Sequence, residues 1–337
     1  MSTVTTHLSD IINPEVMGDA INYKLDAQLK HLRYARVDKS LQGVPGDTKT
    51  VPAWKYIGDA EEVDDDTEAT PVKLEATSTD FTIKCITKCV SITQKAINSG
   101  YGKPVDQAEN QLVDSIKSKV NADLVSCVYG AGASRLYAPS TLAQIGYSGI
   151  VAAETMFNDE EDEIEKVLFI HPEQEAALLN DPLFQSKDKF GGNVAVRGCI
   201  GMAASCWLKK SKKIAKINCE ASASGTSGAV QVTAANQSGF RIYDATNKKV
   251  VMPAVGSYVK EIAVPYFLNQ IIKLEPDSKE TEATETEAPA LTIFLKEDVE
   301  LSHEWLPKLR RHDLTLSKYY GAGLTNESKV LLAKFKA

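Results

Sequence analysis

The chain has 337 residues, of which 43% are hydrophobic and 25% charged. This composition is ordinary for a soluble globular protein of about two domains. No apolar run approaches the ~20 residues that a membrane-spanning helix needs, and the first ten residues lack the basic and then apolar layout of a signal peptide. We therefore expect neither a membrane protein nor a secreted one. The formal net charge of −7 also argues against a protein that wraps nucleic acid tightly through phosphate contacts.

Residues 11–37 are predicted to be mostly helical. The pair Asn13-Pro14 is typical of a helix start, and apolar residues recur after it at steps of three to five. Basic residues gather toward the end of the segment, where the helix dipole favours them. A single amphipathic segment at a terminus must lie against something. Its own domain and a neighbouring copy of the chain are equally good candidates.

A long two-stranded excursion is predicted between residues 41 and 81. A turn cluster at 41–47 leads into an alternating run over 48–57, which contains Pro52 and is therefore confined to an edge or a ribbon. An acidic stretch at 61–66 separates this run from a second strand-like run over 72–81. An isolated two-stranded ribbon is marginal in water. Something outside the excursion must therefore hold it in place.

The next segment contains the clearest helix of the chain. Residues 81–92 alternate as a strand with one wet face, and a Gly- and Pro-containing break at 100–104 follows. Over 105–128 the apolar residues then recur at steps of four, which predicts one long amphipathic helix. The members of this stripe are Ala108, Leu112, Ile116, Val120, Leu124 and Val128.

Beyond residue 130 the pattern is that of mixed α and β structure. A short helix is predicted over 150–157, an acidic loop over 158–163, a buried strand over 166–170 and a helix over 173–180. Strands and turns are predicted over 200–208, 225–243 and 250–264. The acidic, Pro-bounded segment 275–290 has no core-forming residues and is predicted to be an exposed loop. Three final strand-like runs cover 290–299, 303–316 and 330–335, with Gly321-Ala322-Gly323 as punctuation.

A search of the sequence for catalytic and metal-binding patterns gives no strong candidate. The phosphate-binding, dinucleotide-binding, nucleophile-elbow and zinc-protease motifs are absent. Cys85 and Cys89 are not followed by a Cys/His pair at zinc spacing, and the six cysteines are too sparse for a disulfide scaffold. His171 is weighed as a catalytic residue and as a packing or capping residue at a strand end, and the second interpretation is preferred. We predict no catalytic, metal or cofactor site, which favours a structural protein.

The order of these segments resembles the major capsid proteins of tailed bacteriophages of the Hong Kong 97 type. Residues 46–61 resemble the entry to the extended loop of that family, 72–96 its return strand, and 105–128 its spine helix. Residues 299–330 resemble the C-terminal stretch, although His303-Glu304 stands where relatives often carry an acidic-basic dipeptide. The resemblance covers most of the chain and depends on order and spacing more than on any single motif.

The resemblance implies an α+β fold in four parts. These are an N-terminal arm (1–40), an extended β-hairpin loop (41–80), a peripheral domain with the spine helix (81–141 and 265–337) and an axial domain (142–264). It also implies hexamers and pentamers of one chain, which form an icosahedral shell around double-stranded DNA in the virion after assembly in the host cytoplasm. The implied partners are a scaffolding protein, a portal protein, weakly bound DNA and, as a further candidate, a decoration protein.

Two groups of residues are candidates for contacts in such a shell. Residues of the extended loop are expected to touch neighbouring copies: Lys49, Pro52, Trp54, Ile57, Asp59, Val72 and Leu74. Basic residues of the arm and spine helix are expected to pair between subunits or to face DNA, with scattered surface solubility as the alternative: Lys30, Arg33, Arg36, Lys117 and Lys119. Some related shells are crosslinked between lysine and asparagine, for which the candidates are Lys49, Lys55, Lys73, Asn269 and Asn326.

Three other classes of protein compete with this interpretation. A bacterial encapsulin has the same fold but stores an enzyme cargo, and the acidic segment 275–290 argues against it. A cytosolic α/β hydrolase would use His171 or His312 together with a serine or cysteine. A jelly-roll decoration or tail protein would have no place for the long helix over 105–128.

Overall fold

The computed structural model describes residues 31–54, 71–99, 103–158, 164–185, 201–203, 205–274 and 289–337. The predictions for most of the arm, the tip of the extended loop and the acidic loop 275–288 lie outside these residues. The chain divides into two compact units. The first consists of Met1–Val51, Thr79–Leu124 and Thr292–Gly323, and the second of Pro52–Ser78, Val125–Leu291 and Leu324–Ala337. Among the described residues, no helix combines the length and the apolar character needed to cross a membrane.

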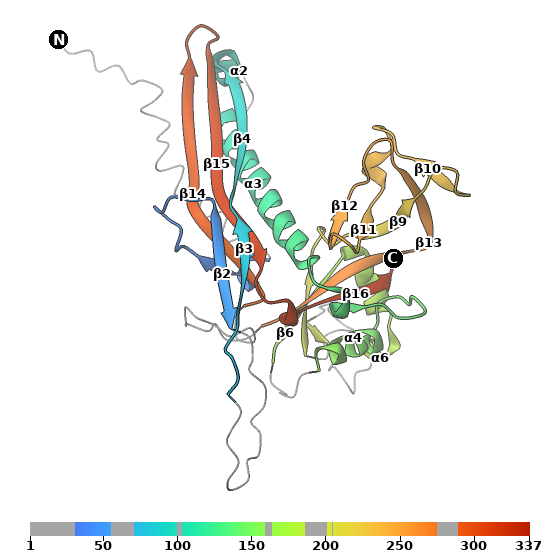
Figure 1. Cartoon of the computed structure of the whole chain (residues 1–337). Helices are drawn as coiled ribbons and strands as arrows, with labels where there is room; N and C mark the ends of the chain where they lie inside the picture. Colours follow the sequence, from blue (N-terminus) through green and yellow to red (C-terminus); the bar gives the residue numbers. More distant parts are fainter. Residues whose placement is uncertain are drawn as a thin grey trace, which may run out of the picture. The chain divides into compact units, whose positions relative to one another are not determined.

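The first unit is built on a sheet with the strand order β1-β14-β15-β4. β15 pairs antiparallel with β4, from Arg311↔Thr93 to Tyr320↔Lys84, and β1 joins β14 in parallel. Figure 1 shows the long helix α3 running beside β4 and β15. The elements are η2 (Leu32–Tyr34), β1 (Arg36–Asp38), β4 (Lys84–Thr93), α2 (Gln94–Ser99), α3 (Pro104–Val128), β14 (Leu291–Leu306) and β15 (Arg311–Leu324).

Helix α3 confirms the helix predicted over 105–128, and its apolar stripe explains its packing. Leu112, Ile116 and Val120 are buried, and they recur at the four-residue spacing that keeps side chains on one helix face. The stripe packs against residues that lie on one face of the two long strands, at the even spacing that the period of two in a strand requires. The strand residues in this core are Ile293, Leu295, Val299, Leu301, Leu314, Leu316 and Tyr320.

Strands β2 (Thr48–Trp54) and β3 (Ala76–Thr82) pair with each other in a two-stranded sheet. Both fall within or next to the range 41–80, where the sequence predicts an extended loop, and β3 runs two residues beyond it. Pro52 lies inside β2, where a two-stranded ribbon tolerates it because each strand has a free edge. We call β2, β3 and residues 71–75 the hairpin.

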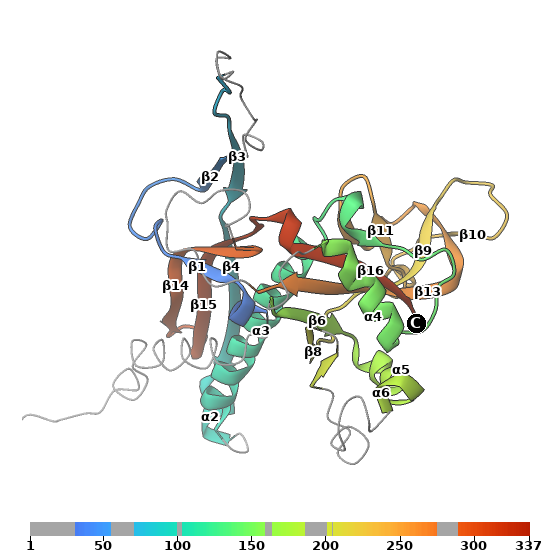
Figure 2. The same ribbon diagram turned by 90° about the horizontal axis from the view of Figure 1, so that it is seen from below.

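The second unit is built on a larger sheet with the order β5-β16-β13-β6-β8-β7, in which β9 and β10 also pair with β13. The central strand β13 pairs antiparallel with β16 and β6, and β6 pairs in parallel with β8. Figure 2 shows α4 beside β16, where Ile150 and Ala153 share a core with Leu331 and Phe335.

The strands of this unit are β5 (Leu136–Tyr137), β6 (Lys166–Ile170), β7 (Met202–Ala203), β8 (Cys206–Lys210), β9 (Lys216–Ser222), β10 (Ala229–Gln231), β11 (Ile242–Asp244), β12 (Lys249–Val251), β13 (Tyr258–Lys273) and β16 (Val330–Lys336). The helices are η3 (Ala133–Arg135), α4 (Tyr147–Glu154), η4 (Thr155–Phe157), η5 (Pro172–Gln174), α5 (Glu175–Leu179), α6 (Pro182–Gln185), η6 (Gln237–Gly239) and η7 (Glu327–Lys329). The domain boundary expected at residue 264 falls inside β13.

Three predictions about local structure are wrong. The helix expected to continue to residue 37 is replaced by η2 and β1, because β1 gains a strand partner in β14 at Thr292–Phe294. The break expected near residue 300 does not exist, since β14 runs on to Leu306 and the chain turns only at 307–310. The glycines of Gly321-Ala322-Gly323 do not end a strand but lie within β15.

Candidate assembly surfaces

The root of the hairpin is anchored on the first unit by an apolar cluster. The Phe81 ring stacks on Phe294 with 5.0 Å between the ring centroids, and Leu41 and Ile83 are buried in the same cluster. Gly323 lies directly under Phe81, and a Cβ atom added there would collide with the ring. The glycine pattern seen in the sequence therefore permits a close approach of two chain segments rather than a turn.

Polar contacts fix the same root. Lys296 Nζ donates to Gly46 O at 2.7 Å and to Asp47 Oδ1 at 2.8 Å, while the Ile83 amide donates to Asp47 O at 2.8 Å. Across the ribbon, Thr50 Oγ1 donates to Asp80 Oδ1 at 2.6 Å. The root is thus held by contacts within this chain.

The part of the hairpin further from the root has no such cover. Val72 is 64% exposed and Leu74 is 58% exposed, and both precede β3 at a spacing that puts them on the same side of an extended chain. Pro52 is also exposed and Trp54 is half-buried. Lys49 donates to Ser40 Oγ at 2.9 Å. The other two predicted contact residues, Ile57 and Asp59, lie outside the described residues.

The basic residues predicted on the spine helix make ion pairs within the chain. Asp123 on α3 lies 2.7 Å from Lys84 Nζ on β4 and 3.1 Å from Lys119 Nζ one helical turn away, and it accepts a hydrogen bond from the Tyr320 hydroxyl. Burial alone would raise the pKa of Asp123, but the hydrogen bonds from Lys84, Tyr320 and Lys119 outweigh it and lower the pKa below its ordinary value. This cluster ties the helix to the sheet.

The remaining members of that predicted group are spread over the first unit. Lys117 lies 3.9 Å from Asp114 on the same helix. Arg33, in η2, is exposed, and Arg36, at the start of β1, is half-buried. Lys30 lies outside the described residues. The structure therefore does not bring these basic residues together into one patch.

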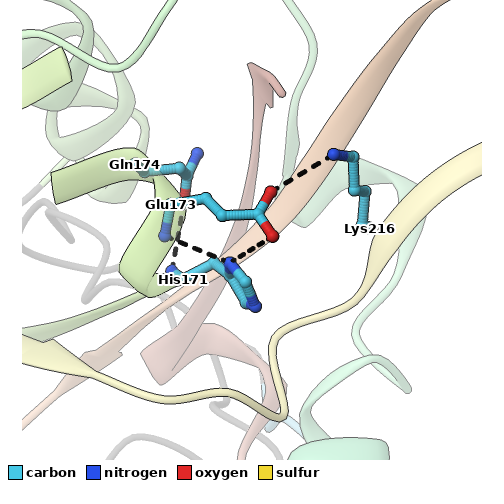
Figure 3. Close-up of polar contacts among 4 residues, drawn as sticks. All are labelled: His171, Glu173, Gln174 and Lys216. Atoms are coloured by element: carbon cyan, nitrogen blue, oxygen red, sulfur yellow. Dashed lines mark hydrogen bonds and ion pairs between the residues drawn. The ribbon is translucent and has the colours of Figure 1, made fainter. Parts of the chain in front are cut away.

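His171 is a helix cap. Its Nδ1 accepts a hydrogen bond from the Glu173 amide at 3.3 Å, and its own amide donates to Gln174 Oε1 at 3.2 Å (Figure 3). This reciprocal pair satisfies two amides at the start of η5. The ring also stacks on Phe267 at 4.7 Å. The capping interpretation of His171 is thus confirmed.

A concentration of lysines near His171 was not predicted to be a site from the sequence. Residues 209–216 contain Lys209, Lys210, Lys212, Lys213 and Lys216. Figure 3 shows Lys216 paired with Glu173, at 3.2 Å. The signal was present as the run KKSKKIAK, but only the fold shows that it occupies one end of β8, the following turn and the start of β9.

His312 is buried in the first unit among three polar and aromatic neighbours. Its Nδ1 lies 2.8 Å from His303 Nε2, and its Nε2 lies 3.0 Å from Gln94 Oε1. The Trp305 ring lies against it with 4.3 Å between centroids. Burial, and then the neighbouring His303, lower the pKa of His312. Both ring nitrogens are therefore occupied in a structural network, which leaves neither for a hydrolase triad.

The candidate crosslinking asparagines are inaccessible. Asn269 is 0% exposed in the middle of β13. Asn326 is buried, and its Oδ1 caps η7 by accepting hydrogen bonds from the Ser328 amide and hydroxyl. Over the described residues there is no group of three or more His, Cys, Asp or Glu side chains placed to hold a metal ion.

Comparison with solved structures defines the class of fold. The capsid of Ralstonia phage GP4 matches with a TM-score of 0.60 at 11% identity, over 90% of this chain and 87% of that one. The cyanophage Pam1 capsid matches with a TM-score of 0.58 at 13% identity, over 91% and 92% of the two chains. The chain therefore has the α+β fold of Hong Kong 97-type phage capsid proteins, as the resemblance implied.

Sequence comparison identifies the family. No family model matches the chain. The major capsid protein of Staphylococcus phage phiMR11 is 32% identical over 211 residues, which are 62% of this chain and 75% of that protein. The chain belongs to the bacteriophage major capsid proteins, which are structural components of the virion and not enzymes. Membership in this family excludes the hydrolase and the decoration protein as interpretations of the chain. It also favours a phage shell over an encapsulin, since the relative is a phage protein.

Proposed function

We propose that this major capsid protein assembles through hexamers and pentamers into a closed icosahedral shell that encloses double-stranded DNA. The observation that carries the proposal is the hairpin, whose root is fixed while Val72 and Leu74 stay more than half exposed. A two-stranded ribbon without a core of its own is marginal in water, so covering these two large apolar side chains with another surface would stabilise it. In a shell of identical subunits, that surface belongs to the next copy.

The energetics suit cooperative assembly. Covering a valine or leucine side chain contributes roughly 1.5–3 kcal/mol, so the two residues supply only a few kcal/mol to each contact. A single contact of that size is weak and reversible. A closed shell repeats it in every subunit, so many weak contacts add up to a stable container that can still correct errors while it grows.

The remaining predicted contacts are part of the same proposal. Pro52 and Trp54 extend the covered surface along β2, and Lys49 on the same strand adds a polar group to it. Ile57 and Asp59 are the apolar and the acidic contact residues that we propose from the sequence alone. Arg33 and Arg36 are candidates for pairing between subunits or for facing DNA. Lys117 and Lys119 are weaker candidates, because each forms an ion pair with a carboxylate on α3. A scaffolding protein, a portal protein and a decoration protein are the further partners that we propose.

Electron microscopy of the purified protein tests the proposal. We expect closed particles with sixfold and fivefold capsomers, and we expect the double variant Val72→Ser/Leu74→Ser to lower the yield of particles by about tenfold or more, since 1.4 kcal/mol is a factor of ten. The control Val72→Ile/Leu74→Met keeps the apolar surface and should assemble like wild type. Wild-type protein that stays a small oligomer under all assembly conditions would refute the proposal.

A further inference from the structure

The turn between β14 and β15 exposes large apolar side chains on the first unit. We call residues 305–310 the basic tip, which lies at one end of the sheet beside α2 (Figure 1). Trp305 is 39% exposed and Leu309 is 61% exposed. Tryptophan and arginine are enriched among the residues that dominate the energetics of protein interfaces. The basic tip contains both residue types, since Arg310 follows Leu309.

The basic tip also carries two exposed cations, Lys308 and Arg310. Within the part of the chain that the structure describes, neither of these side chains forms an ion pair. The next arginine, Arg311, is paired with Asp313 at 2.9 Å and is not counted with them. The exposed carboxylate of Glu304 precedes the tip, on the strand face opposite the tryptophan. The basic tip thus combines two apolar side chains with two positive charges.

Backbone hydrogen bonds hold the basic tip in one conformation. The Leu309 amide donates to Leu306 O at 3.1 Å, and the Arg310 amide donates to Pro307 O at 3.3 Å. The Gln94 amide at the start of α2 donates to Arg310 O at 2.8 Å. Arg310 has a φ of 46°, a left-handed conformation that persists in a residue other than glycine only where its surroundings hold it. The tip is therefore ordered before a partner arrives, which lowers the entropic cost of binding.

We propose that the basic tip of one copy is the surface that covers the hairpin of a second copy. This inference rests on the proposed function, and it names the partner of Val72 and Leu74. The chain that links β2 to β3 carries seven carboxylates between residues 56 and 70 and no lysine or arginine. The hairpin therefore offers exposed apolar side chains beside negative charge, and the basic tip offers exposed apolar side chains beside positive charge. Such complementarity selects the partner and fixes the register of a contact.

Two other occupants of the basic tip fit less well. The acidic segment 275–290 carries six carboxylates but no core-forming residue, so it can neutralise the tip without covering Trp305 and Leu309. The link between β2 and β3 contains Ile57 and Val63 among its carboxylates. A second basic tip would bring like charges together, which disfavours a contact between two tips. The hairpin is thus the segment of the chain that matches the tip in both charge and apolar character.

Charge reversal in the full-length protein tests this contact. The variant Lys308→Glu/Arg310→Glu places like charges opposite each other and should lower the yield of closed particles, counted by electron microscopy, by at least ~10-fold. Adding Asp64→Lys/Asp66→Lys to the same chain restores opposite charges across the contact and should recover most of the yield. Both replaced tip side chains are exposed, so urea denaturation of the unassembled subunit should be unchanged.

A matched control separates the contact from general charge. The variant Lys39→Glu/Lys212→Glu makes the same charge change at exposed lysines outside the tip and should assemble like wild type. A disulfide then joins the two surfaces directly, in a chain whose exposed Cys85 and Cys89 are replaced by serine. Particles assembled from a mixture of Leu74→Cys and Leu309→Cys subunits should give disulfide-linked dimers after oxidation. Particles of either variant alone should give monomers.

The outcomes separate this inference from the proposed function. Normal assembly of the tip variant, an equal loss in the control, or the absence of dimers from mixed particles overturns the inference. So does rescue of the tip variant by Glu280→Lys/Glu282→Lys instead of by the reversal in the hairpin link, because the occupant is then the segment 275–290. Dimers from Leu74→Cys particles alone also overturn it, since hairpins then meet each other. In all these cases wild-type particles still form and the proposed function stands, whereas wild-type protein that never forms particles refutes both.

Discussion

Helix α3 and the hairpin solve the same problem of burying apolar side chains in opposite ways. The stripe of α3 is covered by β14 and β15 of its own chain, and Leu112 is 1% exposed. Val72 and Leu74 on the hairpin have no such cover. Helix α3 and its sheet thus bury their apolar side chains within one chain. We propose that the exposed side chains of the hairpin are covered by a second copy instead.

The largest expected effect comes from a substitution in the core between α3 and its sheet, which is the region that buries its apolar side chains within one chain. Leu112→Ala deletes a buried side chain from the core between α3 and the sheet. Such a deletion costs the transfer free energy and leaves a cavity, so the free energy of unfolding should fall by about 3 kcal/mol. Urea denaturation of the unassembled subunit measures it. Gln111→Ala, at an exposed position of the same helix, should change the free energy by less than about 0.5 kcal/mol. Equal effects of the two variants would contradict the packing described.

The second prediction concerns the charged tie between helix and sheet. Asp123→Asn keeps the shape but removes the charge that Lys84 and Lys119 neutralise, and at pH 7 the subunit should lose about 2 kcal/mol of unfolding free energy. The pKa of Asp123 is lowered in the fold, so its stabilisation is present above the ordinary aspartate pKa and is lost as the pH falls through the lower folded value.

The pH dependence supplies the control for that prediction. The gap in unfolding free energy between wild type and Asp123→Asn should begin to narrow as the pH is lowered from 7 to 3, measured in urea at each pH. A gap that stays constant over this range would mean that the carboxylate charge does not contribute to the stability of the fold.

The third prediction concerns the root of the hairpin, where the hairpin meets the sheet that packs against α3. Gly323→Ala places a methyl group against the Phe81 ring and should displace it from Phe294. Overpacking of this kind costs about 1–3 kcal/mol, and shell assembly should weaken because the hairpin root moves. Gly239→Ala has open space around the added Cβ and should leave the stability equal or slightly higher. Normal stability and normal assembly of Gly323→Ala would show that the root contact is dispensable.

The smallest expected effect concerns the buried His312 and its half-buried neighbour His303. The pKa of His312 is lowered by burial and then by His303, so the fold favours its neutral form. The resulting stabilisation is fully present above the ordinary histidine pKa of about 6.5 and is lost as the pH falls toward the folded value. Wild type should be more stable at pH 7.5 than at pH 5, and His312→Gln should show a smaller difference in urea denaturation. An unchanged difference would assign the pH dependence to other groups.

The long helix was predictable from the sequence because its signal is local. The spacing of Leu112, Ile116, Val120 and Leu124 specifies one helix face without reference to any other part of the chain. The end of β14 was not predictable from the sequence. Polar residues around Glu300 indicate a break, but they lie on one face of the strand, and the strand continues to Leu306. Residues 36–38 form a strand only because β14, more than 250 residues away, offers them an edge.

The candidate surfaces were less predictable than the fold, because the role of each residue depends on partners that are distant in the sequence. The sequence contains Lys84, Lys119 and Asp123, but only folding brings them together with Tyr320. The lysine run at 209–216 is visible as letters, yet Glu173 and Glu175, which neutralise part of it, come from a different helix segment. The sequence predicts a strand break at Gly323. That this glycine instead makes room for the Phe81 ring follows only from the fold, because Phe81 is more than 240 residues away in the chain.

Hydrogen exchange of subunits and of assembled shells tests the central claim most directly. Amides of residues 108–124 in α3 should be protected to the same extent in both states, because their partners belong to the same chain. Amides of residues 72–78 in the hairpin should exchange quickly in the subunit and at least ~10-fold more slowly in the shell. A hairpin that is already as protected as α3 in the free subunit, or that stays unprotected in the shell, would contradict the account.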